Sequence, residues 1–328
     1  MTTMHVIAID DYPDALRSLD CYARLKDHSV TVIRDTVKDP LQLAGRLIDA
    51  DAVILTQQRS PFPRTLIEKL PRLKLISQTG RHTAHIDVAA CTEHGIVVAA
   101  AGAGSPHATA ELTWGLILAS VRHIPQEVAA LKAGVWQTSV GTGLHGKTLG
   151  IYAFGRIGRL VAGVGRAFGM QVVCWGREGS LANARQAGFA VAPSRGAFFE
   201  SSDVISLHIP LNQDTHGIVS GADLACMKVS ALIVNTSRAQ LIEPGALVAS
   251  MRQGSPGWAA IDVFEDEPVV GGQHPLLAMP NVICTPHLGY VEKQALESFY
   301  GGAIDSILGF ATGSPVNVLN PEAIGKRR

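Results

Sequence analysis

Short apolar runs alternate with segments of helical spacing along roughly the first third of the chain. The runs are rich in β-branched residues, whereas segments between them, such as Leu41–Ile48 and Phe62–Leu70, repeat apolar residues at positions three and four apart. We expect strands at His5–Ile9, Val30–Ile33, Ala52–Leu55, Leu73–Ser77 and Ile96–Ala99. Strands that alternate with helical crossovers form an open parallel sheet with helices on both faces.

The stretch Leu149–Arg177 predicts a strand, a tight turn, a helix and a second strand. Its first apolar run ends at Ala153, and Gly169 stands where a glycine closes a helix. Gln171–Trp175 then supplies the parallel partner strand, which requires a crossover of this kind. The helix face that packs on the sheet is formed by Ile157, Leu160, Val161, Val164 and Phe168. The stretch is therefore a βαβ unit.

The turn in this unit reads Ala153-Phe-Gly155-Arg-Ile-Gly158, close to the G-x-G-x-x-G pattern of dinucleotide-binding turns. Gly155 would let backbone N–H groups approach a pyrophosphate, and Gly158 would allow close packing of helix on strand. Alanine replaces the first glycine, which is tolerable at negative φ but costs on the order of 1 kcal/mol in a left-handed turn. We expect Gly155, Arg156, Ile157 and Gly158 to contact the dinucleotide; the alternative is a packed strand–helix turn without a ligand.

Further strands follow this unit, and each ends in a polar loop. We expect the strands at Asp203–His208, Ala231–Asn235, Gly257–Ile261 and Val282–Cys284. Ligands of doubly wound sheets lie at the carboxyl ends of the strands. The loops that should face one crevice are Ile209–Gly217, Thr236–Gln240, Asp262–Pro268 and Thr285–Tyr290.

The glycine- and alanine-rich stretch Ala101–Ser105 reads as a first crossing between domains, with Pro106 at the start of a long helix. A helical segment after Val291 is expected to return to the first domain. The predicted fold class is α/β, with two doubly wound parallel-sheet domains: a Rossmann nucleotide-binding domain, residues 105–292, inserted into a flavodoxin-like substrate-binding domain formed by residues 1–104 and 293–328.

Composition narrows the class of protein. The chain has 328 residues with 28 basic and 28 acidic side chains, so no net field attracts nucleic acid or an anionic membrane. Its five cysteines are widely spaced without a C-x-x-C pair, which argues against a disulfide framework and a zinc site and favours reduced core residues. The start shows no signal peptide and no apolar run is long enough to span a bilayer. We expect a cytoplasmic protein without a bound metal.

Three of the polar loops carry groups that can do chemistry. Asn235-Thr-Ser-Arg238, Asp262-Val-Phe-Glu-Asp-Glu267-Pro and Thr285-Pro-His287-Leu-Gly resemble, in order and spacing, the signatures of the D-isomer-specific 2-hydroxyacid dehydrogenases. That family includes phosphoglycerate, glycerate, lactate and formate dehydrogenases. With the glycine turn these are four ordered motifs, and the resemblance covers nearly the whole chain. It implies that Arg238 is the catalytic arginine, Glu267 the catalytic glutamate and His287 the general acid/base.

The chemistry of this family explains these residue types. Reduction of a 2-oxoacid adds hydride at the carbonyl carbon and a proton at its oxygen, and an imidazole such as His287 exchanges protons near neutral pH. A carboxylate at its other nitrogen, from Glu267, favours the imidazolium and orients the ring. The guanidinium of Arg238 forks onto carboxylate or carbonyl oxygens. Taken singly, each residue has a structural alternative, as a cap or as part of a solvated turn; the three together favour catalysis.

The resemblance also implies further contacts. Asp262 would meet the nicotinamide carboxamide, and Pro210, Thr215 and Thr236 are expected at the cofactor. Thr79, Gly80 and Arg81 lie where the family binds the substrate carboxylate through backbone N–H groups. That loop departs from the family pattern at His82, Ala84 and His85. Arg81 could favour a second acidic group on the substrate, or be a surface arginine.

Cofactor preference depends on the end of the strand Gln171–Trp175, where NAD-selective sites carry Asp or Glu. This chain has Gly176 there, followed by Arg177, which could pair with the 2′-phosphate of NADPH. Glu178 would restore NAD selectivity if it faced the ribose. The sequence predicts use of NAD(P), slightly in favour of NADP, with use of both left open.

We therefore read the chain as an oxidoreductase that interconverts a D-2-hydroxyacid and a 2-oxoacid with a nicotinamide cofactor. One alternative is a catalytically weak nucleotide-bound sensor or protein-interaction scaffold; another is a reaction on phosphite or formate in the same fold. Apolar residues of the helix after Pro106 and of the arm Val121–Trp136 favour a homodimer, although burial within the domain would explain them equally well.

Overall fold

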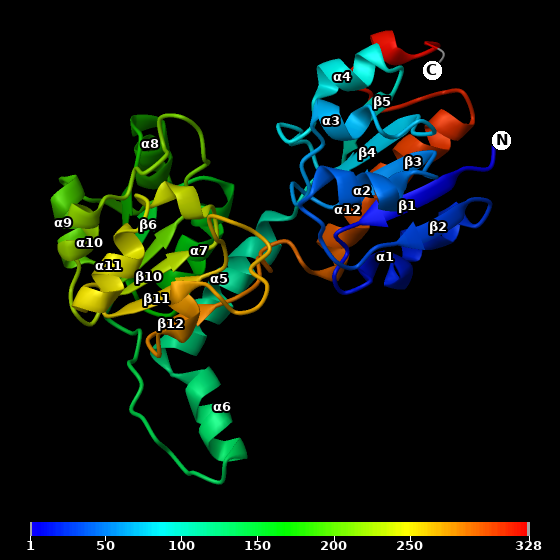
Figure 1. Ribbon diagram of the computed structural model, residues 1–328. Helices are drawn as coiled ribbons and strands as arrows, with labels where there is room; N and C mark the ends of the chain where they lie inside the picture. Colours follow the sequence, from blue (N-terminus) through cyan, green and yellow to red (C-terminus); the bar gives the residue numbers. More distant parts are fainter. Residues whose placement is uncertain (1, 327–328) are drawn as a thin grey trace. The chain divides into compact units, whose positions relative to one another are not determined.

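The computed structural model describes residues 2–326, and the chain divides into two compact units (Figure 1). Unit 1 comprises Met1–Ser105 and Val291–Arg328, and unit 2 comprises Pro106–Tyr290. Unit 2 is therefore an insertion between two pieces of unit 1. Each unit contains its own parallel sheet, so the predicted fold class of two α/β domains is confirmed.

Unit 1 is built on a five-stranded sheet of order β2-β1-β3-β4-β5, with every pair parallel. Its strands are β1 His5–Ile9, β2 Ser29–Val32, β3 Ala52–Leu55, β4 Leu75–Thr79 and β5 Val97–Ala101. The predicted strands differ from these by two residues at most. All residues of β3 and β4 are buried. Strand β3 is accordingly apolar throughout, whereas β4 ends in Ser77, Gln78 and Thr79, whose buried side chains donate hydrogen bonds to backbone carbonyls.

Helices cover both faces of this sheet. The bounds are α1 Ala15–Ser18, η1 Asp20–Leu25, α2 Pro40–Leu47, α3 Arg64–Ile67, α4 Val88–Glu93, α12 Lys293–Ala311 and η4 Pro321–Ala323. The long helix α12 belongs to the returning piece, and the carbonyl of Ala303 accepts a hydrogen bond from Ser77 of β4 at 2.9 Å. A Cβ at Gly302 would lie 2.7 Å from the nitrogen of Gly102, so this approach of helix to strand end requires glycine.

Unit 2 contains a seven-stranded sheet of order β12-β11-β10-β9-β6-β7-β8, again all parallel. Its strands are β6 Thr148–Tyr152, β7 Gln171–Trp175, β8 Ala190–Val191, β9 Val204–Leu207, β10 Leu232–Asn235, β11 Trp258–Ile261 and β12 Val282–Cys284. Apolar clusters on the two faces of the sheet form the core of the unit. The predicted strands of this half are confirmed to within one residue.

The predicted βαβ unit is present as β6, α7 and β7. Helix α7 spans Arg156–Ala167, and Gly169 adopts a left-handed φ of 75° after it, as a helix-closing glycine does. The other helices of unit 2 are α5 Pro106–Val121, α6 Ile124–Lys132, α8 Glu178–Gln186, α9 Arg195–Ser201, α10 Gly221–Ala225, η2 Ala239–Leu241, α11 Ala246–Gln253 and η3 Pro275–Ala278.

Helix α6 and the loop after it extend away from the sheet of unit 2 (Figure 1). None of the nine residues of α6 is buried. Trp136 and Val140 in the following loop are 74% and 93% exposed. Among the described residues, no helix combines the length and apolar character needed to cross a bilayer.

The cysteines differ in burial. Cys21, Cys91 and Cys174 are buried and Cys284 is partly buried, whereas Cys226 is exposed at the end of α10. The expectation that all five are core residues is therefore wrong for Cys226, because the turn after the short helix α10 faces solvent.

Candidate active site and nucleotide-binding turn

The polar loops of unit 2 follow adjacent strands of one sheet. Strands β7 and β8 lie on one side of β6, and β9 to β12 lie on the other side. The connections therefore reverse direction between β6 and β9, and doubly wound sheets bind ligands outside the carboxyl ends of the strands at such a point. The turn Ala153–Gly158 follows β6 directly, so the fold places it at this position.

The two glycines of this turn, Gly155 and Gly158, differ in the space around their Cα atoms. A Cβ at Gly158 would lie 2.4 Å from the carbonyl oxygen of Ala153, so helix α7 can approach β6 only with glycine there. A Cβ at Gly155 would meet nothing within 4 Å, and Gly155 is the N-cap of α7. The first N–H groups of α7 therefore remain accessible to an anion, with Arg156 and Ile157 as its first residues. This cradle fits the pyrophosphate of a dinucleotide.

Ala153 itself is left-handed, with a φ of 75°. The conformation that glycine normally adopts in this turn is thus kept with an alanine, at the steric cost foreseen from the sequence. The backbone N–H of the next residue, Phe154, donates a hydrogen bond of 2.6 Å to Oγ of Ser180 in α8. Ser180 therefore helps to hold the strained turn in place.

His287 and Glu267 are hydrogen-bonded to each other. Nδ1 of His287 lies 2.8 Å from Oε2 and 3.0 Å from Oε1 of Glu267, and the two side chains are only 18% and 17% exposed. Oε1 of Glu267 also accepts the backbone N–H of Phe264 at 2.9 Å. Because the carboxylate accepts a hydrogen bond from Nδ1–H, Nε2 is the ring nitrogen left for proton exchange. This is the arrangement of a proton-transferring imidazole with an orienting carboxylate.

Asp262 is fully buried at the end of β11, and its carboxylate has three donors. Oδ1 accepts the Thr285 hydroxyl at 2.6 Å and the Leu288 N–H at 2.7 Å, and Oδ2 accepts the Gly289 N–H at 2.9 Å. Burial raises the pKa of Asp262, and these hydrogen bonds oppose that effect. The N–H groups come from the two residues after His287, which has a left-handed φ of 53°. Asp262 thus secures the turn that presents His287.

Arg238 lies in the loop after β10, the neighbour of β11. Its Nη1 donates to the carbonyl of Ser237 at 2.7 Å, and its own carbonyl accepts from Nδ2 of Asn235 at 2.9 Å. The side chain is half-buried. The hydroxyl of Thr236 contacts that of Thr113 in α5 at 2.8 Å, so this hydroxyl is directed at the helix.

The end of β7 carries the charges that bear on cofactor preference. Gly176 has no side chain, and Arg177 is the N-cap of α8. Nη2 of Arg177 lies 3.5 Å from Oδ2 of Asp214 in the loop after β9. Glu178 instead pairs with Arg185 within α8 at 2.6 Å. The carboxylate of Glu178 is thus engaged along its own helix.

The loop after β9 is shaped by Thr215, which is almost fully buried. Its hydroxyl donates to the carbonyl of Pro210 at 2.7 Å and accepts the N–H of Asn212 at 2.8 Å. The side chain of Thr215 therefore maintains the loop rather than projecting from it.

In unit 1, the predicted substrate loop begins at the end of β4. The Thr79 hydroxyl donates to the carbonyl of Leu55 at 2.8 Å and accepts the Gln57 N–H at 2.9 Å. Gly80 has a left-handed φ of 83°, and its N–H donates to the carbonyl of Ala101 at 2.6 Å. Arg81 is exposed. Thr79 and Gly80 thus anchor the start of the loop, and the Arg81 side chain extends into solvent within this unit.

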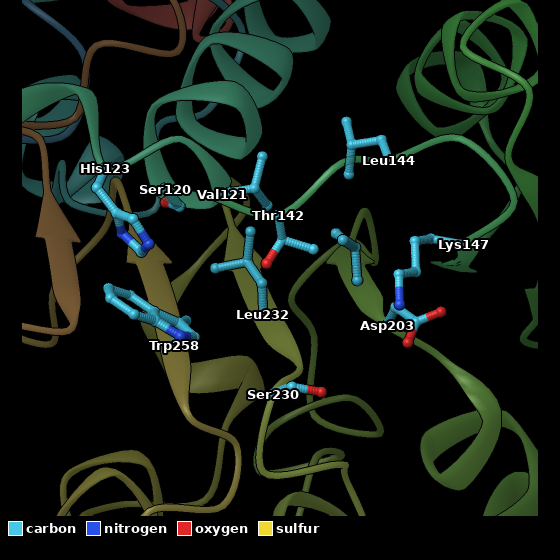
Figure 2. A pocket seen from close by; sticks show the side chains of 11 residues that line it. Ser120, Val121, His123, Thr142, Leu144, Lys147, Asp203, Ser230, Leu232 and Trp258 are labelled. Carbon is cyan, nitrogen blue, oxygen red and sulfur yellow. The ribbon is translucent and has the colours of Figure 1, made fainter. Parts of the chain in front are cut away.

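A hollow of about 170 Å³ lies at the opposite, amino edge of the unit 2 sheet (Figure 2). The ring of His123 packs against that of Trp258 in its wall, with ring centroids 4.6 Å apart and planes tilted by 42°. The hollow is lined by Ser120, Val121, His123, Thr142, Leu144, Lys147, Asp203, Val204, Ser230, Leu232 and Trp258. None of these residues is among those predicted to bind cofactor or substrate.

Three residues near these sites were missed by sequence reasoning: Ser180, Asp214 and Tyr290. The ring of Tyr290 meets that of His287 edge-on at 5.6 Å. Asp214 and Tyr290 lie in loops that the sequence already assigned to the crevice, so their position was the available signal. Ser180 gave no such signal, because it lies in the first turn of a helix and its partner is far away in the sequence.

The sequence of residues 114–289 matches the model of the family described as D-isomer specific 2-hydroxyacid dehydrogenase, NAD binding domain. A D-3-phosphoglycerate dehydrogenase of Methanocaldococcus jannaschii is 39% identical over 77% of this chain and 48% of its own length. A glyoxylate reductase of Aeropyrum pernix is 33% identical over 97% of this chain and 96% of its own. This chain thus spans about half of the first relative and nearly all of the second.

Among solved structures, an oxidoreductase of Ralstonia solanacearum, provisionally assigned as a D-3-phosphoglycerate dehydrogenase, is 50% identical. It superposes with a TM-score of 0.94 over 99% of both chains. A phosphoglycerate oxidoreductase of Vibrio cholerae is 44% identical, with a TM-score of 0.91 over 95% of this chain and 100% of its own. With the family match and these relatives, the sequence resemblance is confirmed: the chain belongs to the D-isomer-specific 2-hydroxyacid dehydrogenase family.

Proposed function

We propose that this protein is an NAD(P)-dependent dehydrogenase that interconverts a D-2-hydroxyacid and its 2-oxoacid. The observation that carries the proposal is the His287–Glu267 pair, with Nδ1 held 2.8 Å from the carboxylate in a partly buried setting. A nucleotide-bound sensor or scaffold has no need of such a pair. Family membership and the anion cradle at Gly155 support the same reading.

In the proposed mechanism, His287 exchanges a proton with the substrate oxygen through Nε2. In reduction the imidazolium donates this proton, and in oxidation the neutral ring accepts it. Glu267 keeps the ring oriented and stabilises its charged form, because the carboxylate accepts from Nδ1. The nicotinamide, when bound, supplies or accepts the hydride.

Substrate binding is assigned to Arg238 together with Thr79, Gly80 and Arg81. The guanidinium of Arg238 would fork onto the carboxylate and carbonyl oxygens of the substrate. The loop after β4 would offer backbone N–H groups. The anchoring of Thr79 and Gly80 to neighbouring strands supports this role, since it preorganises the loop.

The cofactor is assigned to the turn residues Gly155, Arg156, Ile157 and Gly158, and to the end of β7. Further contacts are assigned to Pro210 and to the backbone of Thr215, Thr236 and Asp262, since the side chains of these three residues bond within the protein. We assign a slight preference for NADPH over NADH. It is supported by the absence of a side chain at Gly176, by the pairing of Glu178 with Arg185 and by the position of Arg177 at the start of α8.

The deciding experiment is a panel of 2-oxoacids, including glyoxylate, assayed with NADH and with NADPH, and D-3-phosphoglycerate assayed in the oxidative direction. Loss or gain of reduced-cofactor absorbance reports turnover. The proposal requires turnover of at least one acid, and His287→Asn must lower that turnover by ~10²-fold or more. Binding of the cofactor without turnover of any acid would favour the sensor or scaffold.

We further assign a homodimer in the cytoplasm. Exposed apolar residues of the arm and of the loop that follows it support the dimer, since Leu131, Trp136 and Val140 are 58%, 74% and 93% exposed. Sedimentation equilibrium of the wild type and of Trp136→Ser tests it: a monomeric wild type would contradict the assignment.

A further inference from the structure

An ion pair lies across the carboxyl end of β6. Arg177 follows β7 and Asp214 follows β9, and these two strands flank β6 in the sheet. Nη2 of Arg177 lies 3.5 Å from Oδ2 of Asp214, so this contact joins the loops on either side of the turn Ala153–Gly158, which follows β6. The two side chains are 66% and 83% exposed, so a bound nucleotide can reach both of them.

No other side chain of Gly176–Glu178 can take the place of Arg177 or Asp214 in this ion pair. Glu178 is held by Arg185 at 2.6 Å, and Gly176 carries no side chain. Arg177 is therefore the cation at the end of β7, and Asp214 is the carboxylate that neutralises it. A single contact of 3.5 Å between two exposed side chains is weak, because solvent screens it and both chains lose rotational freedom.

We propose that Asp214 is a specificity-determining residue that competes with the 2′-phosphate of NADPH for the guanidinium of Arg177. The proposal rests on the proposed function, in which the nucleotide binds at the turn with Arg177 beside the ribose. A 2′-phosphate carries roughly two negative charges and three acceptor oxygens, so it can displace the carboxylate from Arg177. A 2′-hydroxyl has no charge and leaves the ion pair intact.

The cost of this competition falls only on the phosphorylated cofactor. To bind NADPH, the site must break the Arg177–Asp214 contact and then hold a phosphate close to the carboxylate that has been displaced. To bind NADH, it does neither. Asp214 thus reduces a preference for NADPH that Arg177 would otherwise create, and the pair together sets the ratio in which the two cofactors are used.

The test uses the full chain and two adenosine probes, adenosine 2′,5′-bisphosphate and 5′-AMP, with binding measured by calorimetry. Asp214→Asn should lower the Kd of the bisphosphate by roughly tenfold, because both electrostatic costs disappear, and change that of 5′-AMP less than about twofold. The matched control is Glu178→Gln, which removes the same charge nearby but from a carboxylate paired with Arg185. It should change the ratio of the two Kd values less than about threefold.

A double-mutant cycle separates competition from simple repulsion. In the Arg177→Ala background, Asp214→Asn should lower the Kd of the bisphosphate by much less than it does in the wild-type background, since no guanidinium remains to be released. A gain equal to that in the wild-type background would overturn the competition. So would an unchanged ratio of the two Kd values in Asp214→Asn.

The same measurements separate this inference from the proposed function. If the wild type binds both probes and Asp214→Asn leaves the ratio of their Kd values unchanged, the role of Asp214 is wrong and the nucleotide site stands. If the wild type binds neither probe, the nucleotide site itself is wrong, and the role of Asp214 fails with it.

Discussion

At the scale of single residues, the candidate chemistry depends on His287 and its partner. His287→Asn removes the group that exchanges a proton with the substrate, so turnover should fall by ~10²–10⁴-fold while cofactor affinity stays close to wild type. Steady-state rates and fluorescence titration with reduced cofactor measure the two quantities. His274 offers the matched control, because it also contacts a glutamate, Glu265, at 3.2 Å. An active His287→Asn enzyme would contradict the proton-transfer role.

Glu267 can be tested through the pH dependence of the reaction. Reduction needs the imidazolium, and Glu267→Gln removes the negative charge that stabilises it. Loss of that charge makes the charged ring less favourable, so the fall in reduction rate with rising pH should move to lower pH. Profiles of kcat/KM against pH measure the shift. Glu265→Gln removes the same charge two residues away and should leave the profile in place; an unshifted profile in Glu267→Gln would exclude the orienting role.

At the scale of secondary-structure elements, the turn between β6 and α7 holds a strained residue. Ala153 has a φ of 75°, where a side chain clashes and glycine does not. Ala153→Gly should raise the free energy of unfolding by about 0.5–1 kcal/mol, after the greater freedom of glycine in the unfolded chain is subtracted. The midpoint of urea unfolding reports this gain. The control is Ala182→Gly, at an exposed position inside α8, which should lower the free energy of unfolding by about 1 kcal/mol.

The turn after β12 depends on a buried carboxylate. Asp262→Asn keeps the shape of the side chain but replaces one acceptor oxygen with a donor, which faces the N–H of Gly289 or Leu288. We expect the free energy of unfolding to fall by about 1–3 kcal/mol. Turnover should fall as well, because this turn positions His287. Unfolding curves and rates should change together. The exposed Asp266→Asn should stay within about 0.5 kcal/mol of wild type.

At the scale of the whole molecule, the buried His208 and the partly buried His85 predict sensitivity to acid. Burial lowers the pKa of His85 to about 4 and that of His208 to about 3. Both are neutral in the folded chain near pH 5, whereas an unfolded histidine titrates near 6.5. The unfolded state therefore binds more protons below pH 6.5, and stability should fall as pH decreases toward 4, by up to about 1.4 kcal/mol per pH unit for each histidine.

Urea unfolding midpoints between pH 7 and pH 4 measure this dependence. His208→Gln should flatten the slope, because the substituted residue takes up no proton in either state. The exposed His216→Gln should leave the slope as it is in the wild type. If His208→Gln and the wild type lose stability in parallel, His208 does not contribute to the acid sensitivity.

The architecture followed from local patterns. Apolar runs, helical spacing and the helix-closing Gly169 located the strands and the βαβ unit, because burial on both faces of a parallel sheet leaves a continuous apolar run in the sequence. The same patterns placed Arg238, Glu267 and His287 after strands that are successive in the sequence. Their assignment to roles came from family resemblance, since spacing alone does not distinguish a catalytic histidine from a capping one.

The sequence did not show which polar side chains pair with one another, and the structure settled this through contacts between residues that are distant in the chain. Glu178 could have faced the ribose until its pairing with Arg185 was seen, and the contact of Arg177 with Asp214 joins loops after two strands that are not adjacent. Asp262 was expected at the cofactor, yet its carboxylate accepts three hydrogen bonds from the protein itself. Periodicity reports which face of an element is buried. Which polar group meets which depends on the order of strands in the sheet, and that order exists only in the folded chain.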